Sequence, residues 1–339
     1  MQNMYNKPLV SVCIPCYNGA KYLKECIDSV LSQSYINFEI IIVDDKSSDN
    51  TLDIINQYND SRISKYINKV NLGLVGNWNR CIELANGEWV KFVFQDDILD
   101  AECIEKLLQK GRQGHKIIGC NRRFIYESEI PDHQKEFYSD NKSTIENLFA
   151  CSTVLSADQV TTISVENIGL NFLGEPSVVL LHKSVFADYG YFNSNLVQLC
   201  DLEFWVRVGC NTGVAFVSDE LVSFRIHQDS VSAENWTKCS FRNSLDSQIL
   251  LYEYLTNPLY KKLREICEAA GINLYLQFIN ETCRSRWVAL KRQLNIFKRD
   301  KTFVKDVKSV TQSNNNIPVG FTIFIPWLIK YLIAPQNLN

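Results

Sequence analysis

The sequence lacks an excess of positive charge. Its 35 Lys and Arg residues stand against 38 Asp and Glu residues, which gives a formal net charge of −3. No stretch interleaves aromatic residues with Lys or Arg, the pattern typical of a surface on which nucleobases stack. We therefore do not expect the protein to bind nucleic acid through a basic face.

Long uninterrupted apolar runs are also missing. A transmembrane helix requires roughly 18 to 20 continuous apolar residues, and the nearest candidate, 319–334, is interrupted by Pro326 and Lys330. A basic stretch, 284–308, precedes it. We expect this tail to lie on an anionic membrane surface, although a contact with a partner chain or with the core would explain the same pattern. The side chains expected to insert are Phe321, Phe324, Trp327 and Leu328.

The 12 cysteines show no repeated spacing, and the N-terminal residues show no signal-peptide pattern. We therefore expect free thiols and a cytoplasmic protein, peripheral at the inner membrane. Cys13 and Cys16 form a C-x-x-C pair, but no second pair or histidine cluster accompanies them. Two thiols buried in the core explain this pair better than a zinc site.

Strand and helix patterns alternate through the first third of the chain. The predicted strands cover 9–15, 38–45, 63–68 and 88–95, and the predicted helices cover 20–33, 47–58 and 74–87. Runs such as 39–43 are too apolar to face water on either side, which indicates a mostly parallel central sheet flanked by helices. We therefore predict a Rossmann-like α/β fold, in which ligands bind at the carboxyl ends of the strands.

The pattern is less regular from about residue 115 to residue 230, and it becomes helical after Glu234. The clearest later elements are a helix at 201–209, strands at 213–218 and 221–227, helices at 241–255, 259–271 and 273–310, and a linker at 312–318. We therefore predict an α/β catalytic domain over 1–230 and a helical C-terminal region over 231–339.

Two pairs of aspartates follow two different predicted strands. Asp44 and Asp45 end the second strand, and Asp96 and Asp97 follow the fourth. Adjacent carboxylates repel one another and must stay hydrated or bind a cation, so a surface turn and a metal site are both possible explanations. The polar turn 15–18 follows the first strand. Three strands therefore bring polar residues to one edge of the predicted sheet.

Four segments resemble the ordered landmarks of family 2 glycosyltransferases. They are VSVCIPCYNGAKYLKECIDSVLSQSY, FEIIIVDDKSSDNT, ANGEWVKFVFQDD and CDLEFWVRV. Their order and spacing cover roughly the first 230 residues and make the resemblance specific. It implies an inverting enzyme with the GT-A fold, of the type that builds bacterial surface polysaccharides.

The resemblance implies that Asp45 accepts a hydrogen bond from the nucleobase of a nucleotide-sugar donor, usually uracil, with Asp44 beside it. Alternatively, both residues cap the following turn and helix, although Ser48 and Asp49 already provide a cap. The other residues expected at the donor are Pro15, Tyr17, Asn18, Gln95, Asp96 and Arg225.

Asp96 and Asp97 resemble the family's D-x-D element, which implies binding of Mn²⁺ or Mg²⁺ together with the donor diphosphate. Phe94 stands where the first acidic residue is usual. We therefore expect Gln95 or a backbone group to contact the ribose. His227 is a further candidate ligand, with a satisfied surface or core histidine as the alternative. For the two aspartates the alternative is a capping loop.

Asp201 matches the family's catalytic base. An inverting transfer needs one carboxylate that takes the proton of the acceptor hydroxyl. Glu203 is the neighbouring candidate, but a helix would point it away from Asp201. The alternative for Asp201 is an N-cap. Glu175 could bond an acceptor hydroxyl or be an exposed turn residue.

We therefore expect a metal-dependent enzyme that moves a sugar from a UDP-linked donor to a glycan hydroxyl, on a lipid-linked acceptor in surface polysaccharide synthesis. The missing acid at Phe94 leaves a catalytically silent sugar-nucleotide-binding scaffold as the second hypothesis. A nucleotidyltransferase ranks last, because no glycine-rich loop with Lys or Arg follows the first strand.

Overall fold

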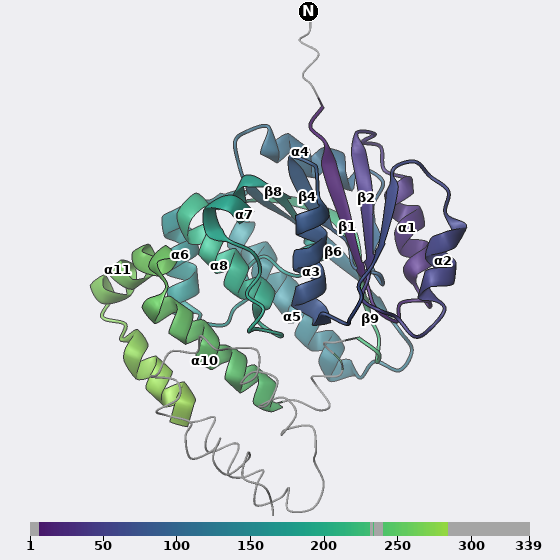
Figure 1. The fold of residues 1–339 in the computed structure, drawn as a ribbon. Coiled ribbons are helices and arrows are strands. Elements are labelled where there is room, and N and C mark those ends of the chain that lie inside the picture. The colour runs from purple at the N-terminus through teal and green to yellow at the C-terminus, as the bar shows by residue number, and fades with distance from the viewer. Residues whose placement is uncertain (1–6, 231–232, 234–239, 284–339) are drawn as a thin grey trace, which may run out of the picture.

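The computed structural model describes residues 7–230, 233 and 240–283. A nine-stranded sheet forms the centre, with the strand order β3-β2-β1-β4-β8-β6-β9-β5 and with β7 paired to β9 (Figure 1). The strands are β1 (Val10–Cys16), β2 (Phe38–Asp44), β3 (Ile63–Ile67), β4 (Trp89–Phe92), β5 (Ile98–Leu99), β6 (Ile117–Tyr126), β7 (Val154–Leu155), β8 (Val179–His182) and β9 (Val214–Ile226).

The N-terminal half of the sheet is parallel. Strand β1 pairs in parallel with β2 and β4, and β2 pairs in parallel with β3. Every residue of β1 is buried, and in β2 only Glu39 is partly exposed. Strand β8 then runs antiparallel to both β4 and β6. The predicted α/β fold is confirmed, and the carboxyl ends of β1, β2 and β4 lie at one edge.

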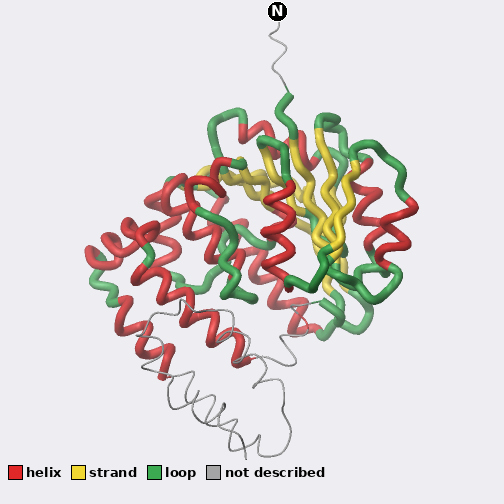
Figure 2. Tube along the Cα trace, viewed as in Figure 1, coloured by secondary structure: helices red, strands yellow, loops and turns green. Residues whose placement is uncertain are grey.

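Helices surround the sheet (Figure 2). Helix α3 packs against β1 and β2, whereas α4 packs against β6, β8 and β9. The α-helices are α1 (Leu23–Leu31), α2 (Thr51–Gln57), α3 (Gly73–Leu84), α4 (Cys103–Gly111), α5 (Asp132–Phe149), α6 (Ala157–Glu166), α7 (Ser184–Tyr189), α8 (Cys200–Thr212), α10 (Ser240–Thr256) and α11 (Lys261–Ala269). Short 3₁₀ turns are η1 (Pro176–Val178) and η2 (Pro258–Tyr260).

The seven elements predicted in the first third of the chain are all present, with different ends. Helix α3 stops at Leu84, before the predicted Asn86-Gly87 closure, because the Asn86 N–H donates to Glu39 on β2 (2.7 Å). At the start of α2 the cap position is Asn50, whose side chain makes no capping hydrogen bond. The cap position thus differs from the predicted Ser48 or Asp49, but Asp49 Oδ1 accepts the N–H of Thr51 (3.0 Å), the first residue of the helix.

Three helices between residues 115 and 230 were not predicted: α5, α6 and the six-residue α7. Helix α5 buries only Tyr138, Ile145 and Phe149, so its apolar period is weak. Helix α6 begins with a capping box in which Ser156 and Gln159 bond each other's backbone N–H groups. That spacing was a detectable start signal in the sequence.

The described C-terminal helices pack onto the same core as the sheet. The side chains of Leu250, Leu251 and Tyr254 on α10 and of Leu263 on α11 are buried and belong to one continuous apolar cluster with β1 and β2. The division of the chain at residue 230 stays a prediction. Among the described residues, no helix combines the length and hydropathy needed to cross a bilayer. The predicted linker and the predicted membrane-surface tail fall beyond residue 283, outside the described residues.

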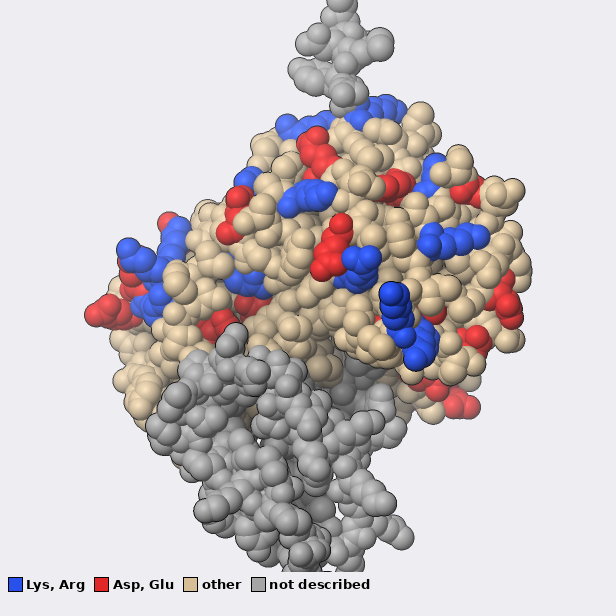
Figure 3. Space-filling model, in the orientation of Figure 1, with Lys and Arg blue, Asp and Glu red and all other residues tan. Residues whose placement is uncertain are grey.

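Positive and negative side chains are interspersed on the face of the molecule drawn in Figure 3. Several are paired there and elsewhere, such as Arg80 with Glu83 (2.8 Å) and Lys116 with Asp188 (3.2 Å). This distribution agrees with the near-zero net charge of the sequence. Exposed pairs of this kind contribute little to stability, so we attribute the stability of the fold mainly to its apolar core.

Candidate active site

The turn after β1 is joined to the loop after β4 by a reciprocal pair of hydrogen bonds. The Tyr17 N–H donates to Gln95 Oε1 (2.9 Å), and Gln95 Nε2 donates to the Tyr17 carbonyl (3.1 Å). A Cβ built on Gly19 would lie 2.2 Å from Gln95 Oε1, so a side chain at position 19 would displace the Gln95 amide from Tyr17. The Gln95 amide, predicted to lie at the ribose, thus holds the turn that carries Tyr17.

Tyr17 and Asn18 stand at the open end of this turn. Tyr17 is 50% exposed, so its ring is available to stack on a flat ligand. Asn18 adopts a positive φ of 49°, which asparagine tolerates better than most residues, and its Oδ1 accepts the Ser48 N–H (2.8 Å). Pro15 is buried in β1 opposite Val43. Pro15 therefore supports the turn from within.

The two residues of the first aspartate pair accept hydrogen bonds from two different loops. Asp44 accepts hydrogen bonds from the N–H (3.0 Å) and the hydroxyl of Ser47, as the turn-capping alternative requires. Asp45 reaches further: its Oδ1 accepts the Leu72 N–H (2.8 Å), and its Oδ2 accepts the Gly73 N–H (2.9 Å) at the start of α3. Two backbone donors fix the orientation of the Asp45 carboxylate.

The second aspartate pair lies beside the end of β9. The Oδ2 atom of Asp96 lies 3.0 Å from Nε2 of the buried His227. Asp97 is fully buried, and its Oδ1 accepts the Arg225 N–H (3.1 Å). The other oxygen, Oδ2, is buried without a hydrogen-bond partner among the described residues. Burial, and then the charge of Asp96, raise the pKa of Asp97 well above its ordinary value.

Arg225, predicted to pair with the donor phosphates, already has partners. Its Nε donates to the Asp96 carbonyl (3.1 Å), and its Nη2 donates to Glu25 Oε2 (2.6 Å). The guanidinium also stacks over the Tyr22 ring, 4.5 Å from the centroid. In this structure Arg225 therefore holds the acidic turn in place.

The described residues include no group of three or more His, Cys, Asp or Glu side chains arranged to hold a metal ion. Asp96 and His227 nevertheless place one oxygen and one nitrogen ligand 3.0 Å apart, next to the orphaned Oδ2 of Asp97. Mg²⁺ and Mn²⁺ commonly take only one or two protein carboxylates and complete their shell with phosphate oxygens and water. These residues therefore fit such a cation bound with a diphosphate.

Asp201 is the second residue of α8. Its Oδ1 accepts the Leu202 N–H (2.7 Å), and its Oδ2 accepts from Asn171 Nδ2 (2.9 Å). Burial raises the pKa of Asp201 to about 7, the Leu202 N–H opposes this rise, and the charge of Glu175 adds to it. The cap position of α8 is Leu199, so the N-cap alternative for Asp201 is wrong.

Glu203 points away from Asp201, as predicted. Its carboxylate receives two hydrogen bonds from Arg207 (2.8 Å each) and a third from the Tyr260 hydroxyl (2.7 Å). The side chain is 1% exposed. A carboxylate bound in this way is not available to take a proton from a ligand.

Glu175 acts on both Asp201 and the acidic turn. Its Oε2 lies 2.9 Å from Nε of Arg122, a residue that is fully buried on β6. Burial is the main cause of the raised pKa of both Asp97 and Asp201, and in both the charge of Glu175 adds to it. Asp97 and Asp201 therefore lie within electrostatic reach of the same carboxylate.

Cys16, at the end of β1, connects the two aspartate pairs in the same way. Burial raises the pKa of its thiol, and the charges of Asp44 and Asp96 raise it further. The predicted donor, metal and base residues thus come together at one edge of the sheet. None of them lies on its opposite end.

This convergence agrees with known proteins. The sequence profile described as "Glycosyl transferase family 2" matches residues 11–165. An uncharacterized glycosyltransferase of Rickettsia typhi is 30% identical over 350 residues, which cover 100% of this chain and 95% of the relative. The chain belongs to glycosyltransferase family 2.

Solved structures share the fold of this glycosyltransferase. TarS of Staphylococcus aureus in complex with UDP matches with a TM-score of 0.56 and 17% identity, covering 95% of this chain and 86% of that one. A mannosyltransferase of Pyrobaculum calidifontis in complex with GDP-Man and Mn²⁺ matches with a TM-score of 0.55 and 14% identity, covering 97% of this chain and 86% of that one. At these identities the likeness shows the fold, and the predicted GT-A fold is confirmed.

The sequence-based predictions missed two buried cations of the glycosyltransferase, Lys91 and Arg122. The Lys91 ammonium on β4 is fully buried and donates to the carbonyls of Phe92 (2.6 Å) and Ser177. The Ser177 hydroxyl in turn accepts the Phe94 N–H (3.0 Å), two residues before Asp96. A lysine inside the apolar run 88–95 was a usable signal, because buried lysines need partners.

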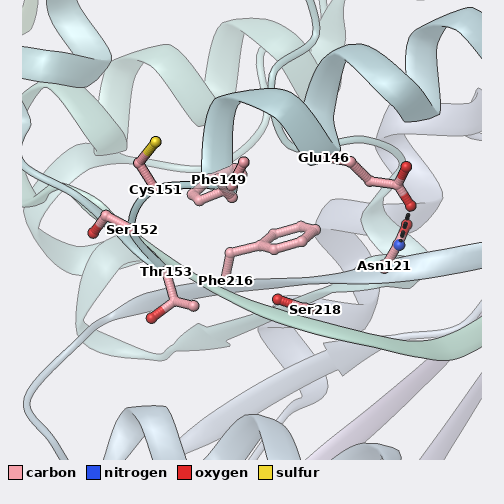
Figure 4. Close-up of a pocket in the computed structure, with 9 residues that line it drawn as sticks. Asn121, Glu146, Phe149, Cys151, Ser152, Thr153, Phe216 and Ser218 are labelled. Carbon is pink, nitrogen blue, oxygen red and sulfur yellow. Dashed lines mark hydrogen bonds between the residues drawn. The ribbon is translucent and has the colours of Figure 1, made fainter.

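The glycosyltransferase also has a cavity of about 380 Å³ that contains none of the predicted site residues (Figure 4). It lies between the end of α5 and the strands β6 and β9. The rings of Phe149 and Phe216 stack there, and the Asn121 amide bonds Glu146 at one side (2.6 Å). A second cavity of about 390 Å³, lined by Lys21, Glu127 and Gln228 among others, borders the loop after His227.

Proposed function

We propose that this glycosyltransferase moves a sugar, with inversion at the anomeric carbon, from a UDP-linked donor to a hydroxyl of a glycan acceptor. One observation carries the proposal: the segment 171–177 contacts both Asp201 and the loop that leads to Asp96. Asn171 Nδ2 donates to Asp201 Oδ2 (2.9 Å), and the Ser177 hydroxyl accepts the Phe94 N–H (3.0 Å). A donor site, a cation site and a base are the three parts that such a transfer needs.

The donor half rests on the turns after β1 and β2. The Asp45 carboxylate, fixed by the Leu72 and Gly73 N–H groups, accepts the N–H of the base, and the exposed Tyr17 ring stacks on it. Because Gln95 is engaged with the Tyr17 backbone, the ribose contact passes to a backbone group of this turn.

The cation half rests on Asp96 and His227, with Asp97 as a further candidate ligand. Asp96 is preferred over Asp97 because Asp96 is partly exposed, whereas Asp97 is fully buried. Bound there, Mn²⁺ or Mg²⁺ would offset the negative charge of the departing nucleoside diphosphate. Arg225 keeps the two aspartates in position through its N–H and its Nε.

Asp201 supplies the base. In its ionised form it takes the proton of the acceptor hydroxyl while that oxygen attacks the anomeric carbon and the nucleoside diphosphate leaves from the opposite face. Asn171 holds Oδ2 of Asp201 and also donates to the Gly174 carbonyl (3.3 Å), so the base and the loop before Glu175 move together. A pKa near 7 gives Asp201 both basic strength and a usable ionised fraction at neutral pH.

For the acceptor we propose a lipid-linked glycan at the cytoplasmic face of the membrane, in the synthesis of a surface polysaccharide. Two arguments support this: the family resemblance, and the basic and apolar character of the sequence 284–334. The sugar hydroxyl itself would lie near Glu175, whose side chain is 22% exposed beside the base.

The test uses the full chain and a panel of UDP- and GDP-linked sugars with and without Mn²⁺. A real donor raises the melting temperature by ligand linkage, and turnover appears as release of the nucleoside diphosphate. We expect a UDP-sugar to stabilise the wild type, and the Asp45→Ala variant to lose this shift. The matched control is Asp60→Ala, which removes an aspartate paired with Arg62 away from the site. Binding without any metal-dependent release would favour a silent sugar-nucleotide-binding protein.

A further inference from the structure

The segment that leads into α8 is held by a residue of the C-terminal helices. Asp246, on α10, is fully buried. Its Oδ2 accepts the N–H groups of Val197 (2.9 Å), Gln198 and Leu199 (3.2 Å). Helix α8 begins at the next residue, Cys200. A single carboxylate from another part of the chain thus accepts three successive backbone N–H groups. These groups directly precede the helix that carries Asp201.

A second contact ties the same two regions together further along α8. The Tyr260 hydroxyl, in η2, donates to Glu203 Oε1 (2.7 Å) and to the Glu203 carbonyl (3.0 Å). This contact lies on the side of α8 that faces away from Asp201. Tyr260 therefore fastens the body of the helix, whereas Asp246 fixes its beginning.

The N–H groups at the start of a helix have no acceptor within the helix, and their dipoles favour a negative charge. Asp246 supplies that charge from outside. The bond from the Leu199 N–H fixes the backbone two residues before Asp201, whose carboxylate must meet Asn171 Nδ2 at 2.9 Å. A shift of the helix start would move the base directly, because Asp201 is its second residue.

We propose that Asp246 is a positioning residue for the transfer reaction: it holds the start of α8 so that the Asp201 carboxylate faces the acceptor hydroxyl. This inference rests on the proposed role of Asp201 as the base. It also makes the described C-terminal helices a working part of the active site.

Asp246 also acts on the charge balance around Asp201. Glu175 is the charged group that acts on Asp201 directly, and the Cys200 thiol lies within electrostatic reach of both Asp201 and Asp246. Loss of the Asp246 charge would free the N–H groups of Val197, Gln198 and Leu199, just before α8, and would remove a negative charge near ionised Asp201. The acidic limb of the rate profile should therefore move to lower pH. A residue that only stabilised the fold would not move it.

The experiment compares Asp246→Asn and Asp246→Ala with the wild-type full chain. The readouts are kcat, the donor KM and the pH profile of nucleoside diphosphate release, measured with the nucleotide sugar of highest wild-type rate. We expect kcat to fall about 10- to 100-fold, the size expected for a catalytic group misplaced by about an ångström. The donor KM should stay unchanged, and the acidic limb should shift down.

Two control variants separate positioning from packing. Glu253→Gln changes another carboxylate of α10, which accepts hydrogen bonds from Asn257 (2.9 Å) and Asn193 (3.4 Å) and not from the segment 197–199. Tyr260→Phe removes the fastening of the helix body. The first control should keep the wild-type kcat and pH profile. The second should lower the melting temperature and leave the acidic limb unmoved.

An unchanged kcat and pH profile in folded Asp246→Asn and Asp246→Ala would overturn the proposal. So would a loss of rate explained entirely by a higher donor KM. If Asp246→Ala does not fold, Asp246→Asn decides, because its amide keeps the shape of the side chain and one acceptor oxygen but removes the charge. A wild type that releases no nucleoside diphosphate would overturn both this proposal and the proposed function, whereas the other outcomes touch this proposal alone.

Discussion

At the ends of β1 and β2 the polar groups satisfy one another, whereas around the start of α8 and the second aspartate pair they do not. Gln95 and Tyr17 bond each other reciprocally, and Asp45 bonds two backbone N–H groups. On the other side, Asp97 Oδ2, His227 Nδ1 and Arg122 Nη1 are buried without hydrogen-bond partners among the described residues.

This difference separates a region that keeps a fixed shape, at the ends of β1 and β2, from a region suited to catalysis, around the start of α8 and the second aspartate pair. A satisfied network has a single low-energy arrangement and keeps its shape. Buried carboxylates without full compensation have raised pKa values, as Asp97 and Asp201 do, and such groups gather at sites of chemistry. We call these the donor side and the reactive side. Variants on the reactive side should act on kcat, and variants on the donor side should act on KM.

The largest effect is expected on the reactive side from Asp201→Asn. The amide keeps the shape of the side chain but cannot take a proton, so kcat should fall by about 10²- to 10⁴-fold. Donor binding, measured by the thermal shift, should stay at the wild-type level. Glu203→Gln is not a suitable control because that carboxylate is buried in a structural network. Turnover at the wild-type rate in Asp201→Asn would remove this residue from the mechanism.

A smaller loss is expected from Arg225→Ala, which removes the group that holds the acidic turn. Without the bonds to the Asp96 carbonyl and to Glu25, the turn can move. The Mn²⁺ concentration for half-maximal turnover should rise about 10- to 100-fold, as for other residues that orient metal ligands. Arg123→Ala is the matched control, since Arg123 bonds Ser223 (2.8 Å) and does not reach the turn. Equal metal dependence in both variants would contradict this role.

On the donor side, Gly19→Ala should disturb binding without changing the chemistry. The new Cβ would displace the Gln95 amide and break the reciprocal pair, at a cost of about 1–3 kcal/mol for the two lost hydrogen bonds. We expect the donor KM to rise by about tenfold or more, with kcat preserved. The double variant Gly19→Ala, Gln95→Ala relieves the collision, so its KM should be lower than the sum of the single effects predicts. Additive effects would show that the two residues are not coupled.

The smallest and sharpest test is the pH profile. The pKa of Asp201 is raised to about 7, so the base is protonated below that value, and the rate should rise through pH 7 with a slope of one proton. Glu175→Gln removes a negative charge that raises this pKa, and the acidic limb should therefore shift to lower pH. The ratio of rates at pH 6 and pH 8 measures the shift. Glu88→Gln, an exposed carboxylate near His182, should leave the ratio unchanged.

Much of this arrangement could be predicted because it is local in the sequence. The alternation of apolar runs placed β1, β2 and β4, and the position of Asp45 and Asp96 after parallel strands placed them at one edge. The family resemblance added the role of Asp201 as the base, which stays a prediction. Glu203 was set aside correctly, since two positions along a helix point in different directions.

The unpredicted parts depend on contacts between distant segments. Asp246 bonds residues almost fifty positions away, and no period in the sequence connects α10 with the start of α8. Arg122 is one of two adjacent arginines, and only the fold decides that it is the buried one. Helix α5 was not predicted because only three of its side chains are buried, so its sequence shows little apolar periodicity. Contacts between distant segments and weakly amphipathic helices cannot be predicted from the apolar pattern of a single sequence.

The reciprocal bonds between Gln95 and Tyr17 involve an amide and a peptide group, neither of which gains or loses a proton at ordinary pH. An acidic residue at position 95 would repel the neighbouring carboxylates and would become neutral at low pH. The hydrogen bonds of Gln95 do not change with pH in this way. We therefore expect acidification to stop turnover, by protonating Asp201, before it disturbs the hydrogen bonds between Gln95 and Tyr17. A bound nucleotide would then stay bound without reacting until Asp201 loses its proton.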